Sequence, residues 1–69
     1  MKYALSDLSP RERTVLRGIL DDKTYVEIAH AMSLSLESIK TYSARMRAKL
    51  GVKTKTGLAL FAQKHEKDL

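Results

Sequence analysis

The stretch from Ser35 to Val52, SLESIKTYSARMRAKLGV, predicts a single helix that ends at a glycine. At about 100° per residue, one side of this helix suits a protein core and holds Ile39, Ser43, Met46 and Leu50. The opposite side holds small and charged side chains, namely Glu37, Lys40, Thr41, Ala44, Arg45 and Ala48. Because this second side has little apolar bulk, the helix could lie close against a large polyanion.

Positive charge is concentrated on the second half of this helix and the turn that follows it. The chain has a net charge of +5, yet residues 1–39 carry five Lys and Arg against six Asp and Glu. Residues 40–55 carry six basic residues and no acid, and residues 56–69 carry two of each sign. A solvated surface usually mixes the two signs, so this segregation favours an anionic partner. Nucleic acid is favoured over a membrane because no aromatic-rich apolar face accompanies the charge.

Length and composition narrow the classes of protein. A chain of 69 residues predicts one small domain, near the size at which a single core is only marginally stable. The sequence has no cysteine and no run long enough for a membrane span or a signal peptide, which favours a soluble cytoplasmic protein. His30 and His65 lack the spacing of metal ligands, and nothing indicates an activated nucleophile. We therefore expect no metal, no other cofactor and no enzymatic activity.

Capping patterns predict where further helices begin. The segments from Ser9 to Glu12 and from Thr24 to Glu27 each place a hydroxyl residue three positions before a glutamate, as in a capping box. The two helices that follow would bury the apolar side chains of Val15, Leu16, Ile19, Leu20, Ile28, Ala29 and Met32. We predict an all-α fold of four helices, over about residues 10–20, 25–32, 36–50 and 55–66.

The predicted connections are short. Asp22 lies between the first two helices, where a left-handed conformation is expected and aspartate tolerates it. A turn over Met32–Leu34 joins the second helix to the third, giving the outline of a helix-turn-helix. Residues 1–8 are expected to form an arm, and residues 9–69 the domain, with three apolar side chains of the arm packing on it: Tyr3, Leu5 and Leu8. We assign Arg11, Arg13 and Arg17 to a solvated face, with phosphate contact by Arg11 or Arg13 as the alternative.

The fourth helix contains five consecutive apolar residues, from Leu58 to Ala62. Such a run covers more than one side of a helix, so one side can pack on the domain while another needs a second partner. In so small a domain we expect that partner to be another copy of the chain or a further domain, and we assign the surface to a dimer. The residues assigned to this dimer interface are Leu58, Leu60, Phe61 and Ala62.

With these residues in place, the chain resembles the DNA-binding domain of bacterial LuxR-type regulators, the group that includes the NarL/FixJ response regulators. The similar blocks are LSPRERTVL from Leu8, EIA from Glu27, SIKTY from Ser38 and KLGV from Lys49. Together they extend from about Leu8 to Ala62, in the family's order and spacing. The resemblance implies a helix-turn-helix domain over residues 9–69 that binds double-stranded DNA as a homodimer, in the bacterial cytoplasm and on the nucleoid. RNA polymerase or another regulator would be a further partner.

The resemblance also implies roles for individual residues. Lys40, Thr41 and Ala44 fall where family members touch base edges in the major groove. Thr24, Ser38, Tyr42, Arg47 and Lys49 fall where the family holds phosphates or the flanks of the third helix. Arg45 is added to the phosphate contacts from its place on the helical wheel. For Arg47 and Lys49 a solvated face is an equal alternative. The Tyr42 ring could pack against the second helix as well as, or in place of, a phosphate contact by its hydroxyl.

The sequence departs from the family pattern at three positions. Asp22 replaces a common glycine, Val26 a frequent lysine and Tyr42 a frequent histidine. With Ala44 on the reading side, few side chains remain to distinguish bases, so specificity would depend on dimer spacing and DNA shape. Two other functions are alternatives to a dimeric regulator: a sigma-factor-like promoter-binding module and a protein-interaction adaptor. The KLGV segment that ends the third helix and the apolar fourth helix disfavour the first. An adaptor would have no evident need for a basic third helix.

Overall fold

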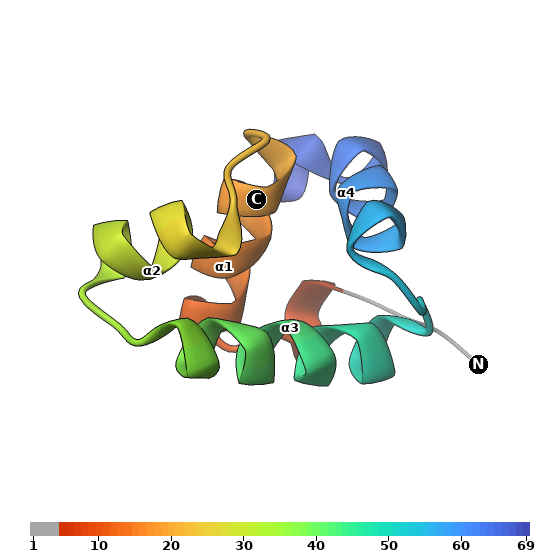
Figure 1. Ribbon diagram of the computed structural model, residues 1–69. Helices are drawn as coiled ribbons and strands as arrows, with labels where there is room; N and C mark the ends of the chain where they lie inside the picture. The colour runs from red at the N-terminus through yellow and green to blue at the C-terminus, as the bar shows by residue number, and fades with distance from the viewer. Residues whose placement is uncertain (1–4) are drawn as a thin grey trace.

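The computed structural model describes residues 5–69, so the predicted packing of Tyr3 lies outside the described residues (Figure 1). Four α-helices form the domain: α1 over Pro10–Leu20, α2 over Tyr25–Met32, α3 over Leu36–Leu50 and α4 over Lys55–Lys64. Short 3-10 turns flank them, η1 over Leu5–Asp7 and η2 over Glu66–Asp68. The prediction of an all-α fold with four helices is confirmed, and the described residues contain no strand.

The end of the fourth helix differs from the sequence prediction. It stops at Lys64 rather than at about residue 66. The backbone of His65 leaves helical values, with φ −117° and ψ 23°, and the chain then tightens into η2. The His65 amide still donates to the carbonyls of Phe61 and Ala62, at 3.2 Å each, which closes the last turn of α4.

Side-chain caps fix where the helices begin, and both predicted capping boxes are confirmed. At α1 the Glu12 amide donates to Ser9 Oγ at 3.2 Å, and the Ser9 amide donates to Glu12 Oε1 at 2.8 Å. Thr24 and Glu27 make the same pair of bonds at α2. Ser35 and Thr54 cap α3 and α4 through their hydroxyl groups. Each such cap is typically worth about 1 kcal/mol, so local sequence specifies the helix starts before tertiary packing adds to them.

Left-handed residues end or separate the helices at three places. Asp22 has φ 63°, which confirms the conformation predicted for the first connection. Ser33 has φ 56° at the end of α2, inside the predicted turn. Gly51 has φ 70° and caps α3, as predicted, and the Val52 amide donates to the Arg47 carbonyl at 3.0 Å.

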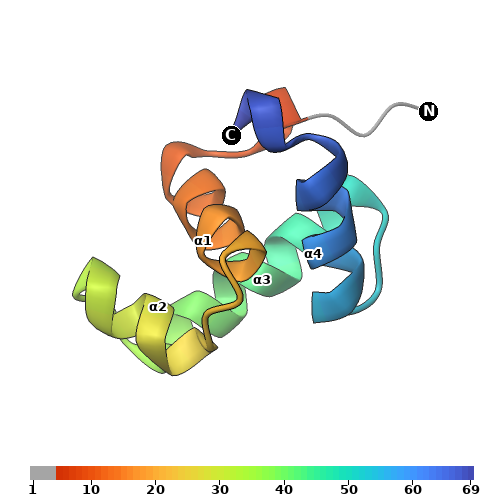
Figure 2. The ribbon, with the colours of Figure 1, turned by 90° about the horizontal axis from the view of Figure 1, so that it is seen from above.

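The core lies around α1, which packs against α3 and α4, while α2 packs mainly against α3 (Figures 1 and 2). The four residues predicted for the inner side of α3 are all buried. Leu20 and Met32, predicted as core, are only partly buried, and Leu5 and Leu8 join the core as expected. The division into an arm and a domain stays a prediction.

Arg13 links the two ends of the described chain. Its guanidinium donates to the Leu5 carbonyl at 3.1 Å and to the Asp68 carbonyl at 3.4 Å. Seen from above, η1 and η2 lie on the same side of α1 (Figure 2). Arg13 therefore has a structural role in this fold, which its predicted place on a solvated face did not suggest.

Candidate nucleic-acid interface

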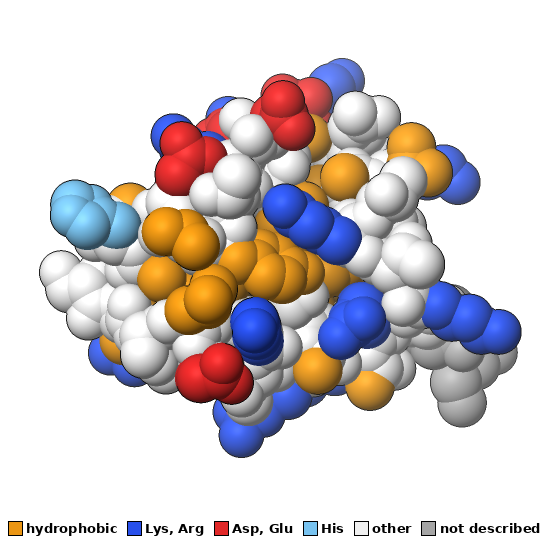
Figure 3. Space-filling model, viewed as in Figure 1, with side chains coloured by type: hydrophobic (Ala, Val, Ile, Leu, Met, Phe, Trp, Pro, Cys, Tyr) orange, Lys and Arg blue, Asp and Glu red, His pale blue; other side chains and the backbone are white. Residues whose placement is uncertain are grey.

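The outward side of α3 is an exposed surface that carries basic side chains. Lys40, Thr41, Ala44 and Arg45 are all exposed, while Ile39 and Met46 behind them are fully buried. Figure 3 shows Lys and Arg side chains along the lower edge of the view, which α3 forms in Figure 1. Visible Asp and Glu side chains lie mainly at the opposite edge. Of the six residues predicted for the outer side of the wheel, Lys40, Thr41 and Ala44 thus form an exposed strip, and Arg45 lies beside it.

A shallow hollow runs along one flank of this strip. It is lined by Glu37, Ser38, Thr41, Tyr42 and Arg45. Ser38 lies in the first turn of α3, where its amide and hydroxyl both bond to the Ser35 hydroxyl, at 3.1 and 3.0 Å. Its side chain is therefore held at the start of the helix, where unpaired amides favour an anion.

Lys40 is exposed and only loosely held. Its Nζ lies 3.7 Å from Glu37 Oε1 in an i,i+3 pair, and its side chain is 55% exposed. Such a surface pair is typically worth less than about 1 kcal/mol and is screened by salt. Lys40 can therefore exchange this partner for an acceptor on another molecule.

Tyr42 has a packed ring and an exposed hydroxyl. Its ring is half-buried and packs against the core cluster. Its hydroxyl remains on the surface, where it accepts a hydrogen bond from Arg11 Nη1 at 3.4 Å. The hydroxyl proton is left to donate elsewhere.

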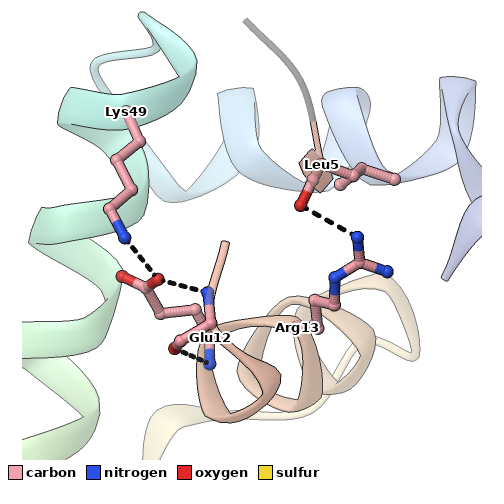
Figure 4. Close-up of polar contacts among 5 residues, drawn as sticks. Leu5, Glu12, Arg13 and Lys49 are labelled. Carbon is pink, nitrogen blue, oxygen red and sulfur yellow. Dashed lines mark hydrogen bonds and ion pairs between the residues drawn. The ribbon is translucent and has the colours of Figure 1, made fainter. Parts of the chain in front are cut away.

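Lys49 is committed to a buried partner. Its Nζ lies 2.7 Å from Oε1 of Glu12, whose side chain is 2% exposed (Figure 4). Burial raises the pKa of Glu12, but the hydrogen bond from Lys49 and that from the Ser9 amide outweigh it, so the pKa lies below the ordinary glutamate value. Glu12 Oε2 is buried without a partner among the described residues. This ion pair restricts how far Lys49 can reach toward a phosphate.

Arg47 also bonds within the domain. Its guanidinium donates to the carbonyls of Ser43 and Lys53, both at 3.4 Å. These long bonds tie the last turns of α3 to the connection that leads into α4. Arg47 is half-buried, in contrast with the fully exposed strip beside it.

Tyr25 of α2 contacts residues of α3 and α4, a role that the sequence did not reveal. Its hydroxyl shares a hydrogen bond with the buried hydroxyl of Ser43, which explains a polar residue on the inner side of α3. Lys55 Nζ lies 4.8 Å from the centre of the Tyr25 ring and donates to the Lys23 carbonyl at 3.3 Å. The two residues are 18 positions apart and lie on different helices, so the sequence gave no local signal of this pairing.

Thr24 lies at the start of α2, with its hydroxyl accepting from the Glu27 amide at 3.1 Å. Thr24 is exposed, so its position at the helix start is open to a ligand although its side chain already has a partner. The pKa of Glu27 is lowered by its hydrogen bonds with Thr24.

The residues predicted for a dimer interface divide between two sides of α4. Leu58 and Ala62 have no exposed surface, because both pack in the core of their own domain. Leu60 is 56% exposed, and Phe61 is half-buried. A shallow groove on this outer side is lined by Val52, Gly57, Leu60, Phe61 and Lys64. The apolar surface that α4 offers is therefore narrower than the sequence suggested.

Within residues 5–69, no cluster of three or more His, Cys, Asp or Glu side chains is arranged to hold a metal ion. None of the helices over these residues is both long and apolar enough to cross a membrane.

The amino-acid sequence was compared with those of known families and proteins. Residues 6–62 match the family described as bacterial regulatory proteins, luxR family. The chain is 39% identical over 62 residues to a putative transcriptional regulator of Pseudomonas aeruginosa, and equally to the DNA-binding transcriptional activator EvgA of Escherichia coli K12. These matches cover 90% of the chain and 30% of each relative.

A third relative is the DNA-binding transcriptional activator DevR/DosR of Mycobacterium tuberculosis, 40% identical over 58 residues, which are 84% of this chain and 27% of that protein. The chain thus spans less than a third of the length of these relatives. The matched segment contains all four α-helices apart from the last residues of α4. The chain belongs to the LuxR family of bacterial regulatory proteins, whose members are DNA-binding regulators of transcription.

Proposed function

We propose that this domain binds duplex DNA by inserting α3 into the major groove. The observation that carries the proposal is the exposed strip of Lys40, Thr41 and Ala44, which combines a cation with small side chains opposite a fully buried side. Lys40 would donate to guanine O6 or N7, and Thr41 would offer its hydroxyl or its methyl group. Ala44 offers apolar contact alone and lets the helix approach the bases closely.

Phosphate contacts would flank this strip. Ser38, Tyr42 and Arg45 line the hollow on one side and supply hydroxyl and guanidinium donors. Thr24 stands at the start of α2, where exposed amides suit a phosphate. We place Arg47 and Lys49 lower among the proposed contacts because both already donate to acceptors within the domain.

We also propose that two copies pair through the outer side of α4. Leu60 and Phe61 present the apolar surface there, and Lys64 lies at the edge of the same groove. Pairing would hold two α3 helices at a fixed separation, so that the spacing of two half-sites adds to the specificity.

Binding to a duplex is expected to weaken steeply with ionic strength, because each neutralised phosphate releases counterions. At fixed salt, Lys40→Ala is expected to lower the affinity about tenfold, the loss of one good base contact. Fluorescence anisotropy of a labelled duplex over a salt series measures both effects.

The matched control for Lys40→Ala is Lys67→Ala, which removes the same charge from an exposed residue of η2. This control is expected to change the affinity little. Absence of wild-type binding at low salt would reject the proposal, and so would equal effects of the two variants. A protein-interaction adaptor would give the first of these results.

Leu60→Asp is expected to weaken dimerisation at least about tenfold, because a carboxylate would replace the largest exposed apolar side chain of α4. Sedimentation equilibrium of the wild type and the variant provides the measurement. Val26→Asp is a suitable control, since Val26 is the other large exposed apolar residue, at 62%, and lies on α2. A wild type that stays monomeric at high concentration would contradict pairing through α4.

A further inference from the structure

Arg11 brings a side chain of α1 to the flank of α3. It is the second residue of α1 and is exposed. Its Nη1 donates to the Tyr42 hydroxyl at 3.4 Å. Tyr42 in turn lines the hollow that it shares with Ser38 and Arg45. A cation from a different helix thus stands beside the donors proposed for phosphate.

The charge of Arg11 is not used by the fold. Among the described residues Arg11 has no ion pair, whereas Arg17 on the same helix lies 3.6 Å from Asp21. A cation in the first turn of a helix is also opposed by the helix dipole. Its single bond to a neutral phenol is long and exposed, so it contributes little to stability. The position of Arg11 therefore costs the domain some stability and leaves its positive charge available to an anion.

Tyr42 gives Arg11 a defined place. Because the phenol oxygen accepts from Arg11, its own O–H points away and can donate. One phosphate oxygen could then receive a bond from the tyrosine while the guanidinium neutralises the same phosphate, in the way that arginine forks bind phosphate. The half-buried ring fixes the hydroxyl, so the pair is arranged before any ligand arrives.

We propose that Arg11 is an additional contact to the DNA backbone, with Tyr42 as its positioning residue. The proposal rests on the proposed function, since it assumes that α3 binds duplex DNA. It widens the interface from the helix-turn-helix to the start of α1. The contact is to phosphate and carries no sequence preference.

The test compares Arg11→Ala with Arg17→Ala, which removes the same charge from the opposite end of α1. Each variant is titrated over a salt series against a short fluorescent duplex of mixed sequence. Arg11→Ala is expected to lower the affinity about fivefold and to reduce the slope of log affinity against log salt by about 0.9, the value for one phosphate. Arg17→Ala is expected to keep the wild-type slope. In thermal unfolding followed by circular dichroism, both variants are expected to stay folded, with Arg11→Ala no less stable than Arg17→Ala.

Three outcomes are distinguishable. If the wild type does not bind the duplex, the proposed function fails. If the wild type binds but Arg11→Ala keeps its slope, only the contact by Arg11 is overturned. A double-mutant cycle with Tyr42→Phe tests the positioning role: the affinity lost on Arg11→Ala is expected to be smaller in the Tyr42→Phe background. Equal losses in the two backgrounds would show that Arg11 acts without Tyr42.

Discussion

Replacing Lys49 by methionine is expected to lower the free energy of unfolding by about 2 kcal/mol, because it leaves the buried carboxylate of Glu12 without a counter-ion. Removing one partner of a fully buried pair costs about 3–5 kcal/mol, and we expect less because the Lys49 side chain is 39% exposed, which lets water reach the site. The whole free energy of unfolding of a domain of this size is roughly 3–10 kcal/mol, so this loss would be a large part of it. Urea unfolding at neutral pH, followed by circular dichroism, measures the loss.

Adding a second substitution, at Glu12, should restore most of the lost free energy of unfolding. In the double variant Glu12→Gln/Lys49→Met, the side chain of residue 12 is neutral and needs no counter-ion. Its oxygen can still accept the capping-box hydrogen bond from the backbone amide of Ser9. Arg17→Met is the matched control for an exposed pair, with side chains 49% and 45% exposed, and should cost at most a few tenths of a kcal/mol. A double variant as unstable as Lys49→Met would show that charge is not the cause.

The stability contributed by the ion pair between Glu12 and Lys49 should depend on pH. Because the pKa of Glu12 is lowered in the folded state, its ion pair stabilises the fold above the unfolded glutamate pKa of about 4.3. That contribution disappears as the pH falls through the lower folded-state pKa. The difference in stability between the wild type and Lys49→Met should therefore shrink in acid. A difference that persists in acid would point to packing of the lysine stem.

Ala44→Glu is expected to lower DNA affinity about 100-fold or more, since the carboxylate would face the groove and its phosphates. The new carboxylate would also lie four residues after Lys40 and pair with it, removing the main candidate for base contact. Ala44 is exposed and glutamate is a good helix former, so the fold should be kept. Fluorescence anisotropy with a labelled duplex provides the measurement, alongside thermal unfolding.

The control makes the same substitution on another helix. Ala31 is exposed on α2, so Ala31→Glu changes the net charge equally while leaving the outward side of α3 untouched. We expect it to lower the affinity only severalfold, through long-range repulsion. Equal losses in the two variants would mean that total charge controls binding and that α3 does not enter the groove.

Local signals carried most of the fold prediction. Ser9, Thr24 and Ser35 cap helices through bonds to their own neighbours, so each start can be recognised without knowledge of the tertiary structure. The period of apolar residues gave the buried side of α3 for the same reason, because a helix fixes which side chains share a face. The left-handed conformation of Asp22 was also a local prediction, because aspartate tolerates it in a short connection between helices.

Contacts between distant residues were not predictable in the same way. Glu12 was recognised as a cap, but its bond to Lys49 spans 37 positions and depends on how α1 lies against α3. The same limit applies to α4, where five consecutive apolar residues do not say which side meets the core. The structure places Leu58 and Ala62 there and leaves Leu60 outside.

In the candidate site, too, local features were predictable and contacts between helices were not. The exposed strip of Lys40, Thr41 and Ala44 follows from the helical wheel, since it lies opposite the buried side. Whether a cation on that helix is free to bind a ligand depends on its neighbours from other helices. Lys49 donates to Glu12, and Arg47 donates to backbone carbonyls. Arg11, which lies on α1, donates to Tyr42 on the flank of α3.

The hydroxyl bond between Tyr25 and Ser43 and the ion pair between Glu12 and Lys49 hold α3 at two points along its length, one from α2 and one from α1. A helix fastened twice to its scaffold reaches its ligand without first having to become ordered. Such preorganisation reduces the conformational entropy lost on association. The heat-capacity change of complex formation should then reflect the surface removed from water, with no contribution from coupled folding.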